Sequence, residues 1–389
     1  MIKLQKCTFY NEDKTKRELC DFIMESDILS MGDECKKFEK GFSLKQGRKS
    51  SVFVNSGSSA NLVLFQSLLN LGRLKEGDIV AVSTLTWATN IMPLIQLGLK
   101  PFLVDCELSS LNISTKNLKK ALSIQPNIKA LFITNTLGFC SDLASIEEFC
   151  NNENIMLFED NCEALGSSAN GKLLGNFGIA STFSFFVGHH LSTIEGGMIC
   201  TDDMELSLQM TMCRAHGWDR NIDNNAQQKI RRENQVDDFY SKYTFYDLGF
   251  NVRPTDINGF IGNLQLQYWD EIVDKRHKNF ITINDAIEAN DDLISIEYNK
   301  MDIVSSFAIP IIAKDKSILK RYTNLFMNTG VEIRPMIAGN MSRQPFYQKY
   351  VSNPGLQENA EFIHHHSFYF GNNADLSTDE IGKLLSLIG

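Results

Sequence analysis

The chain has 389 residues, which is enough for one large and one smaller domain with a sizeable core. Hydrophobic residues make up 43% of it and charged residues 22%, a composition typical of a globular protein rather than a disordered one. The formal net charge of −9 argues against nucleic acid or an anionic membrane as the main partner. Neither a signal-peptide core nor a run of about 18 apolar residues is present, so we expect a cytoplasmic protein.

The nine cysteines are scattered and form no CxxC pair, so we expect reduced thiols and neither a metal site nor an iron–sulfur cluster. His364 to His366 form a run that fits a solvated helix end better than a metal site.

The first 60 residues predict two helices and then a strand that meets a helix. The helices are expected over 14–26 and 33–45, with Asp33 as a possible cap of the second. A strand over 51–56 then reaches a turn of serines and a glycine, and apolar residues follow at helical spacing. Free N–H groups and the helix dipole make such a turn an anion site, although a plain serine N-cap fits the same pattern.

The next segment alternates short apolar runs with helical or loop stretches. Strands are predicted over 79–84, 101–106, 129–136, 155–160, 181–186 and 196–201. This order predicts a mostly parallel sheet with helices on both faces and ligands beyond the carboxyl ends of its strands. Trp87, Asp160 and His189 follow strand ends and are therefore expected in one neighbourhood. No GxGxxG motif follows the first strand, which disfavours a nicotinamide cofactor.

The rest of the chain predicts a polar arm and a second domain. A helix over 205–221 precedes a polar segment, 221–245, that we interpret as a lid, an interface arm or a mobile segment. A loop and a long amphipathic helix follow within 246–280, and we place the domain boundary there, giving domains 1–264 and 265–389. The second domain is expected to be mixed α+β, with strands over 307–314 and 330–337 and helices over 316–329 and 377–388.

The segment from Ser184 to Gly197 carries two adjacent histidines before a Glu-Gly-Gly sequence. By itself such a pair is more often an ordinary core or surface feature than a site. Imidazole, with an ordinary pKa near 6.5, can nevertheless take up and release a proton near neutral pH.

Six motifs together resemble the DegT/DnrJ/EryC1/StrS sugar aminotransferase family. They are SGSSANL at 56–62, TW at 86–87, EDNCEALG at 159–166, the histidine segment at 184–197, RAHGW at 214–218 and GFNVRP at 249–254. In most of this family a lysine stands six residues before the Glu-Gly-Gly and holds pyridoxal 5'-phosphate (PLP) as a Schiff base. That position is His189 here, which resembles the branch typified by GDP-4-keto-6-deoxymannose 3-dehydratase.

The resemblance implies the PLP-dependent transferase fold of the aspartate aminotransferase type and a set of site residues. Asp160 would meet the ring nitrogen, Trp87 would stack on the ring, and Glu163 would lie near its phenolic oxygen. Gly57, Ser58 and Ser184 would hold the phosphate.

Other roles implied by the resemblance concern the substrate and a second subunit. Asn251 would reach the phosphate from the other subunit of a homodimer with shared sites. Arg253 would bind a carboxylate or a diphosphate, and His216 and Arg334 are weaker candidates for substrate contact.

The implied reaction follows from the missing lysine. The working cofactor would be pyridoxamine 5'-phosphate (PMP), loaded by L-glutamate, and His189 would be the acid and base that removes the carbon-3 hydroxyl of a nucleotide-linked 4-keto-6-deoxy sugar. The product would be a 3,6-dideoxy-4-keto sugar for surface polysaccharide. GDP is the first candidate nucleotide, and the nucleotide itself stays open. A nucleotide-sugar aminotransferase and a non-catalytic cofactor-binding protein are the alternatives.

Overall fold

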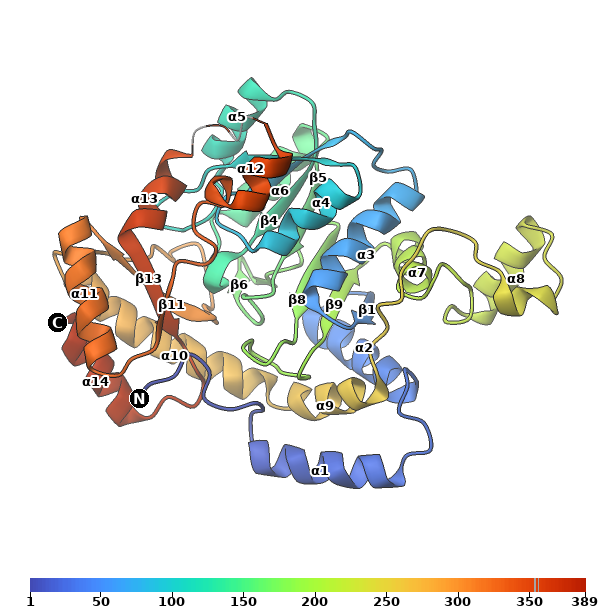
Figure 1. Ribbon diagram of the computed structural model, residues 1–389, viewed down its shortest axis with the longest axis horizontal. Coiled ribbons are helices and arrows are strands. Elements are labelled where there is room, and N and C mark those ends of the chain that lie inside the picture. Colours follow the sequence, from blue (N-terminus) through green and yellow to red (C-terminus); the bar gives the residue numbers. More distant parts are fainter. Residues whose placement is uncertain (353–354, 356) are drawn as a thin grey trace.

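The computed structural model describes residues 1–352, 355 and 357–389. Its large sheet (Figure 1) has seven strands in the order β1 (Ser50–Val54), β9 (Gly197–Thr201), β8 (Ala180–Ser184), β5 (Met156–Asp160), β4 (Ile128–Thr134), β2 (Ile79–Ser83) and β3 (Lys100–Val104). Strand β9 is antiparallel to both of its neighbours, and every other neighbouring pair is parallel. The expected mostly parallel sheet is therefore confirmed.

Helices cover both faces of this sheet because its strands are apolar on both sides. In β4, Ala130 and Phe132 belong to the core on one face, while Leu131 and Ile133 belong to the core on the other. The first core is completed by α3 (Gly57–Asn70), α4 (Met92–Gln96) and α7 (Met204–Cys213). The second is completed by α5 (Thr115–Ile124) and α6 (Leu143–Asn152).

The N-terminal helices are α1 (Glu12–Glu25) and α2 (Asp33–Gln46), close to their expected bounds. The prediction that Asp33 caps α2 is wrong, because its exposed side chain instead pairs with Lys36 at 3.0 Å. The carboxylate at this helix start belongs to Asp256, which accepts hydrogen bonds from the N–H groups of Gly32 (2.7 Å) and Cys35 (3.0 Å). The free N–H groups at the start of α2 are thus paired with a carboxylate that lies more than 200 residues later in the sequence.

The long helix expected within 246–280 is two helices, α9 (Asp256–Leu266) and α10 (Trp269–Glu288). Beyond them lies an antiparallel sheet in the order β10 (Leu293–Ile294), β11 (Ala308–Ala313), β13 (Ser367–Gly371) and β12 (Ile333–Pro335). The helices that pack on it are α11 (Lys316–Asn328), α13 (Glu358–His366) and α14 (Thr378–Ile388), whereas α12 (Pro345–Tyr350) packs against the first core of the large sheet. The histidine run ends α13, as expected. Residues 264 and 265 fall within α9, and a domain boundary there stays a prediction.

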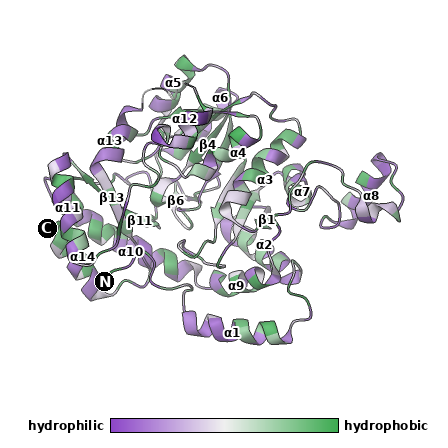
Figure 2. Cartoon of the chain, viewed as in Figure 1, coloured by the Kyte–Doolittle hydropathy of each residue, from purple (hydrophilic) through white to green (hydrophobic). Residues whose placement is uncertain are grey.

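The polar segment over 221–245 contains α8 (Asn224–Glu233) and extends away from the body of the protein (Figure 1). None of the residues of α8 is buried, and Figure 2 colours the helix mostly as hydrophilic. Exposed aromatic side chains follow it, with Phe239 72% and Tyr243 79% exposed. The segment is thus no core element of this chain, and its role as a lid or an interface arm stays a prediction.

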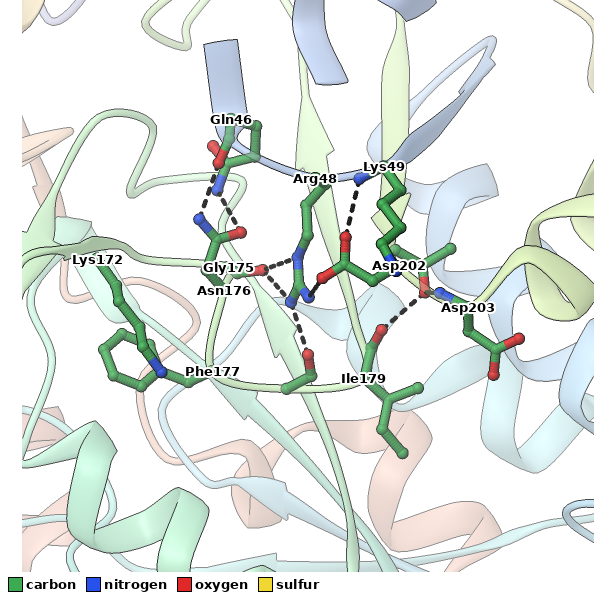
Figure 3. Close-up of polar contacts among 12 residues, drawn as sticks. Gln46, Arg48, Lys49, Lys172, Gly175, Asn176, Phe177, Ile179, Asp202 and Asp203 are labelled. Atoms are coloured by element: carbon green, nitrogen blue, oxygen red, sulfur yellow. Dashed lines mark hydrogen bonds and ion pairs between the residues drawn. The ribbon is translucent and has the colours of Figure 1, made fainter. Parts of the chain in front are cut away.

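A buried arginine fixes the loop that leads into β8 (Figure 3). The guanidinium of Arg48 donates to the carbonyls of Gly175 and Gly178 and pairs with Asp202 at 2.8 Å. From the other side, the carboxylate of Glu159 accepts the N–H groups of Gly175 (2.7 Å) and Gly178 (2.9 Å). These contacts hold β8, and hence the histidine segment after it, in place. The remaining short elements are β6 (Ser168–Ala169), β7 (Lys172–Leu173) and 3-10 turns at Ala88–Asn90, Thr136–Gly138, Tyr240–Tyr243 and Met341–Arg343.

Candidate active site

A cavity of about 670 Å³ lies where the carboxyl ends of β5 and β8 face residues near the smaller sheet. Trp87, Asp160 and His189 line it together, as the strand ends predict. The other predicted site residues in its wall are Gly57, Ser58, Glu163, Ser184 and Arg334. The sequence did not indicate the remaining lining, which includes Leu4, Gln5, Asn90, Thr134, Cys162, Phe186, Phe307, Glu332 and Tyr369.

The start of α3 forms one end of the cavity. The hydroxyl of Ser56 caps the helix by accepting the N–H of Ser59 at 3.1 Å. A Cβ atom on Gly57 would lie 2.7 Å from Cβ of Ser184, so only glycine allows the helix to approach β8 this closely. Ser56 serves as the cap of the helix, while Gly57, Ser58 and Ser184 line the cavity, so an anion site at this helix start stays a prediction.

Asp160 ends β5 and is 4% exposed. Its Oδ2 atom accepts the side-chain N–H groups of Asn90 (2.7 Å) and Asn61 (3.3 Å), and its Oδ1 atom accepts the backbone N–H of Cys162 at 2.9 Å. The carboxylate thus closes a local turn, as its position after a strand allowed, and is held at the cavity wall by two amides from other elements.

Trp87 and Glu163 both line this cavity. Trp87 is 56% exposed, so its indole offers a free surface. The buried carboxyl of Glu163 accepts the N–H of Leu137 at 2.6 Å. Burial raises the pKa of Glu163 to about 8, with a further increase from the charge of Asp160. A carboxyl that is largely protonated at neutral pH can donate a hydrogen bond, as a glutamine amide can.

His189 follows the end of β8, and its partly buried ring contacts two phenyl rings. The ring centroids of Phe307 and Phe186 lie 5.3 and 6.2 Å away. Burial and the charge of Arg276 lower the pKa of His189 to about 4, against a small opposing effect of the Cys162 backbone. The imidazole is therefore neutral at pH 7 and can accept a proton.

His190 does not line the main cavity. Its Nε2 atom lies 2.8 Å from the carbonyl oxygen of Ser305, and the side chain is 6% exposed. Because a carbonyl can only accept, this nitrogen carries the proton of the neutral ring. The two neighbouring histidines thus face different surroundings, and only His189 is placed for chemistry in the cavity.

Arg334 reaches the cavity from β12 and pairs with Glu332 at 2.5 Å. The second carboxylate oxygen of Glu332 accepts the N–H of Leu4 at 3.0 Å. The N-terminal segment is held there by a short pairing in which Ile2 lies beside Val331. Two distant parts of the chain therefore form one wall of the cavity.

Three predicted residues lie outside this wall. Asn251 accepts the Nε–H of Arg253 at 3.0 Å, and the Arg253 guanidinium lies 5.4 Å from the ring of Trp218. The ring of His216 lies 4.9 Å from the same tryptophan. The loop that carries Asn251 and Arg253 nevertheless borders the cavity end of β1, because the carbonyl oxygen of Val252 accepts the N–H of Asn55 at 3.0 Å. Their contact with a second subunit stays a prediction.

The described residues include neither a metal-binding cluster nor a helix that could span a membrane. Within residues 1–352, 355 and 357–389, no three His, Cys, Asp or Glu side chains gather in a way that could hold a metal ion. Among the described helices, none is both long and apolar enough to cross a membrane.

Comparison with known proteins shows the family of this chain. The model of the DegT/DnrJ/EryC1/StrS aminotransferase family matches residues 11–388. The chain belongs to this family. GDP-4-keto-6-deoxy-D-mannose 3-dehydratase of Yersinia pseudotuberculosis is 33% identical to this DegT-family protein over 372 residues, 94% of this chain and 93% of that protein.

Solved structures confirm the aminotransferase-type fold. GDP-4-keto-6-deoxymannose-3-dehydratase with a trapped PLP-glutamate geminal diamine superposes with a TM-score of 0.91 at 31% identity, over 100% of both chains. Helicobacter pylori PseC, an aminotransferase of pseudoaminic acid biosynthesis, gives 0.83 at 21% identity over 99% of this chain and 96% of that one, which shows the fold alone. This DegT-family protein is a PLP-dependent, sugar-modifying enzyme.

The cavity suits the cofactor of the family. The start of α3 offers N–H groups and hydroxyls to a phosphate, and Gly57 keeps the space there that a Cβ would fill. Asp160 provides a buried carboxylate for a protonated ring nitrogen, and Trp87 provides an exposed aromatic face.

Proposed function

We propose that this enzyme removes the carbon-3 hydroxyl of a nucleotide-linked 4-keto-6-deoxy sugar, with GDP as the first candidate nucleotide and L-glutamate as amino donor. The supporting observation is that His189 lies in the cavity wall, where no lysine is found among the lining residues that the structure describes. Imidazole cannot form the Schiff base that lysine forms, so an aminotransferase that keeps its cofactor on a lysine is disfavoured.

The proposed binding roles divide the cavity between cofactor and sugar. Gly57, Ser58 and Ser184 bind the phosphate, Trp87 stacks on the ring, and Asp160 holds the ring nitrogen in its protonated form. When bound, PMP supplies an amine and an electron-withdrawing ring. The protonated carboxyl of Glu163 replaces the amide that related aminotransferases place near the phenolic oxygen.

His189 moves the proton. A nitrogen of the imidazole takes up a proton from the cofactor carbon that bears the amine. It then gives this proton to the carbon-3 hydroxyl of the sugar, which leaves as water. The low pKa of the ring keeps it in the accepting form before the reaction. Phe186 and Phe307 shield the ring and limit the access of water.

The charged residues of the site would recognise the two anionic substrates. Arg334, after release from Glu332, can bind a carboxylate, and Arg253 can bind a carboxylate or diphosphate. We also propose a homodimer in which Asn251, Arg253 and His216 act on the site of the second subunit, since none of them lines the cavity of its own chain. A monomer in light scattering that turns over at the normal rate contradicts the shared site.

The role of His189 is tested by comparing His189→Asn with His190→Asn. The first variant should lose dehydration by at least about 10²–10⁴-fold, typical of a general acid and base, while it still binds PLP. His190→Asn is the neighbouring control, and it should keep most of the activity. A dead His190 variant beside a normal His189 variant assigns the role to His190 instead.

A further variant tests the missing lysine. His189→Lys should bind the cofactor covalently, with the absorbance of an imine and resistance to dialysis, and should favour amino transfer over dehydration. A covalent lysine imine in the unaltered protein, trapped with borohydride, would contradict the dehydratase.

A further inference from the structure

The carboxylate of Asp160 is surrounded by more side-chain donors than its place after a strand requires. Asn90 comes from the turn after β2, and Asn61 comes from the second turn of α3. Both amides converge on one atom, Oδ2, at 2.7 and 3.3 Å. The backbone N–H of Cys162 holds the other oxygen, Oδ1.

The orientation of both amides is determined by their second partners. The NH2 group of Asn61 also donates to the carbonyl oxygen of Thr89 at 3.2 Å, and that of Asn90 donates to the hydroxyl of Thr134 at 3.2 Å. That hydroxyl is in turn 2.6 Å from the hydroxyl of Thr86. A reversed amide would place its oxygen against a carboxylate, so the donors must face Asp160.

The stability of the folded protein does not explain why asparagine occupies either position. The Oδ1 atoms of Asn61 and Asn90 are both buried, and neither has a hydrogen-bond partner in the described part of the chain. Burying an unpaired carbonyl costs free energy, which an apolar side chain of the same size would avoid. What the two asparagines provide in return is a pair of donors to a single carboxylate oxygen.

We propose that Asn90 and Asn61 are positioning residues that aim Asp160 at the ring nitrogen of the cofactor. A carboxylate oxygen accepts about two hydrogen bonds, so the two amides occupy Oδ2, whereas Oδ1 keeps capacity for one more donor from the cavity. The amides also hold the carboxylate plane still. The inference rests on the proposed role of Asp160. It adds that side chains from α3 and from the turn after β2 hold Asp160 in the orientation that this role requires.

The test uses apo protein loaded with PLP that carries 15N in its ring, and the readout is the 15N chemical shift of the ring nitrogen. Asn90→Leu and Asn61→Leu should each move this signal toward that of the unprotonated ring and should raise the dissociation constant of PLP at least fivefold. If Asn90→Leu does not fold, Asn61→Leu tests the same oxygen through the longer bond.

Asn112→Leu is the matched control. Asn112 is also buried, and its Oδ1 atom has no partner among the described residues, but its NH2 group donates to the carbonyls of Ser110 and Phe139, neither of which lines the cavity. Its variant should change the melting temperature and leave the 15N signal unchanged. An unchanged signal in both cavity variants, or an equal shift in Asn112→Leu, overturns the inference.

Asp160→Asn separates this inference from the proposed function. If Asp160→Asn moves the signal while the two asparagine variants do not, Asp160 has its role without their help. If Asp160→Asn also leaves the signal unchanged, the role of Asp160 itself is wrong.

Discussion

The stability of the folded protein should fall in mild acid because His189 is held neutral. The pKa of His189 is about 4 in the folded state, whereas an unfolded histidine has an ordinary value of 6.5. Between these values the unfolded state binds one proton more, so stability falls as the pH drops from about 6.5 to about 4. The difference of pKa values corresponds to about 3 kcal/mol, most of which is present at pH 7 and lost by pH 4.

The assay is urea unfolding of apo protein at several pH values between 4 and 8. His189→Asn cannot take up the proton, so its unfolding free energy should fall by about 3 kcal/mol less than that of the unaltered protein over this range. Ile124→Ala, at an exposed position of α5 that does not line the cavity, leaves the surroundings of His189 unchanged and should retain the full decrease. If His189→Asn and the unaltered protein lose the same free energy, the imidazole is not held neutral by its surroundings.

Three further substitutions test separate parts of the structure. Gly57→Ala should force α3 away from Ser184, which lowers stability by about 1–3 kcal/mol and weakens PLP binding; unchanged binding in a dialysis titration would contradict the close approach. Trp87→Ala should raise the dissociation constant of PLP roughly tenfold with little change in melting temperature, measured by fluorescence. Arg48→Met should lower stability by about 3 kcal/mol in calorimetry, because two carbonyls lose their donors, and an unchanged melting temperature would refute this.

The parts of the site that the sequence predicts are those carried by strand ends. An apolar run followed by Asp160, or by the histidine segment, indicates both the strand and its functional end, because parallel strands end at one edge of the sheet. The turn at Gly57 is predictable from the serines and glycine between a strand and a helix, whereas its close approach to the side chain of Ser184 is not.

The parts that the sequence does not predict depend on contacts between distant residues. Asp256 caps α2 across more than 200 positions, so the nearby Asp33 was the natural and wrong expectation. Asn61 is one of several buried polar residues of α3, together with Gln66 and Ser67, and nothing in its spacing marks it as a partner of Asp160. Glu332 and Leu4 meet only because Ile2 of the N-terminal segment pairs with Val331 just before β12, which no local pattern indicates.

The most direct test of the proposed dehydratase is mass spectrometry of the product formed from GDP-4-keto-6-deoxymannose with PLP and L-glutamate. The account predicts a sugar that has lost the carbon-3 oxygen and kept its 4-keto group, with release of ammonia and consumption of glutamate. A parallel screen of CDP-, UDP- and dTDP-linked 4-keto sugars identifies the nucleotide. A product that keeps the carbon-3 hydroxyl and gains an amino group at carbon 4 would contradict the account and assign the enzyme to the aminotransferases of its family.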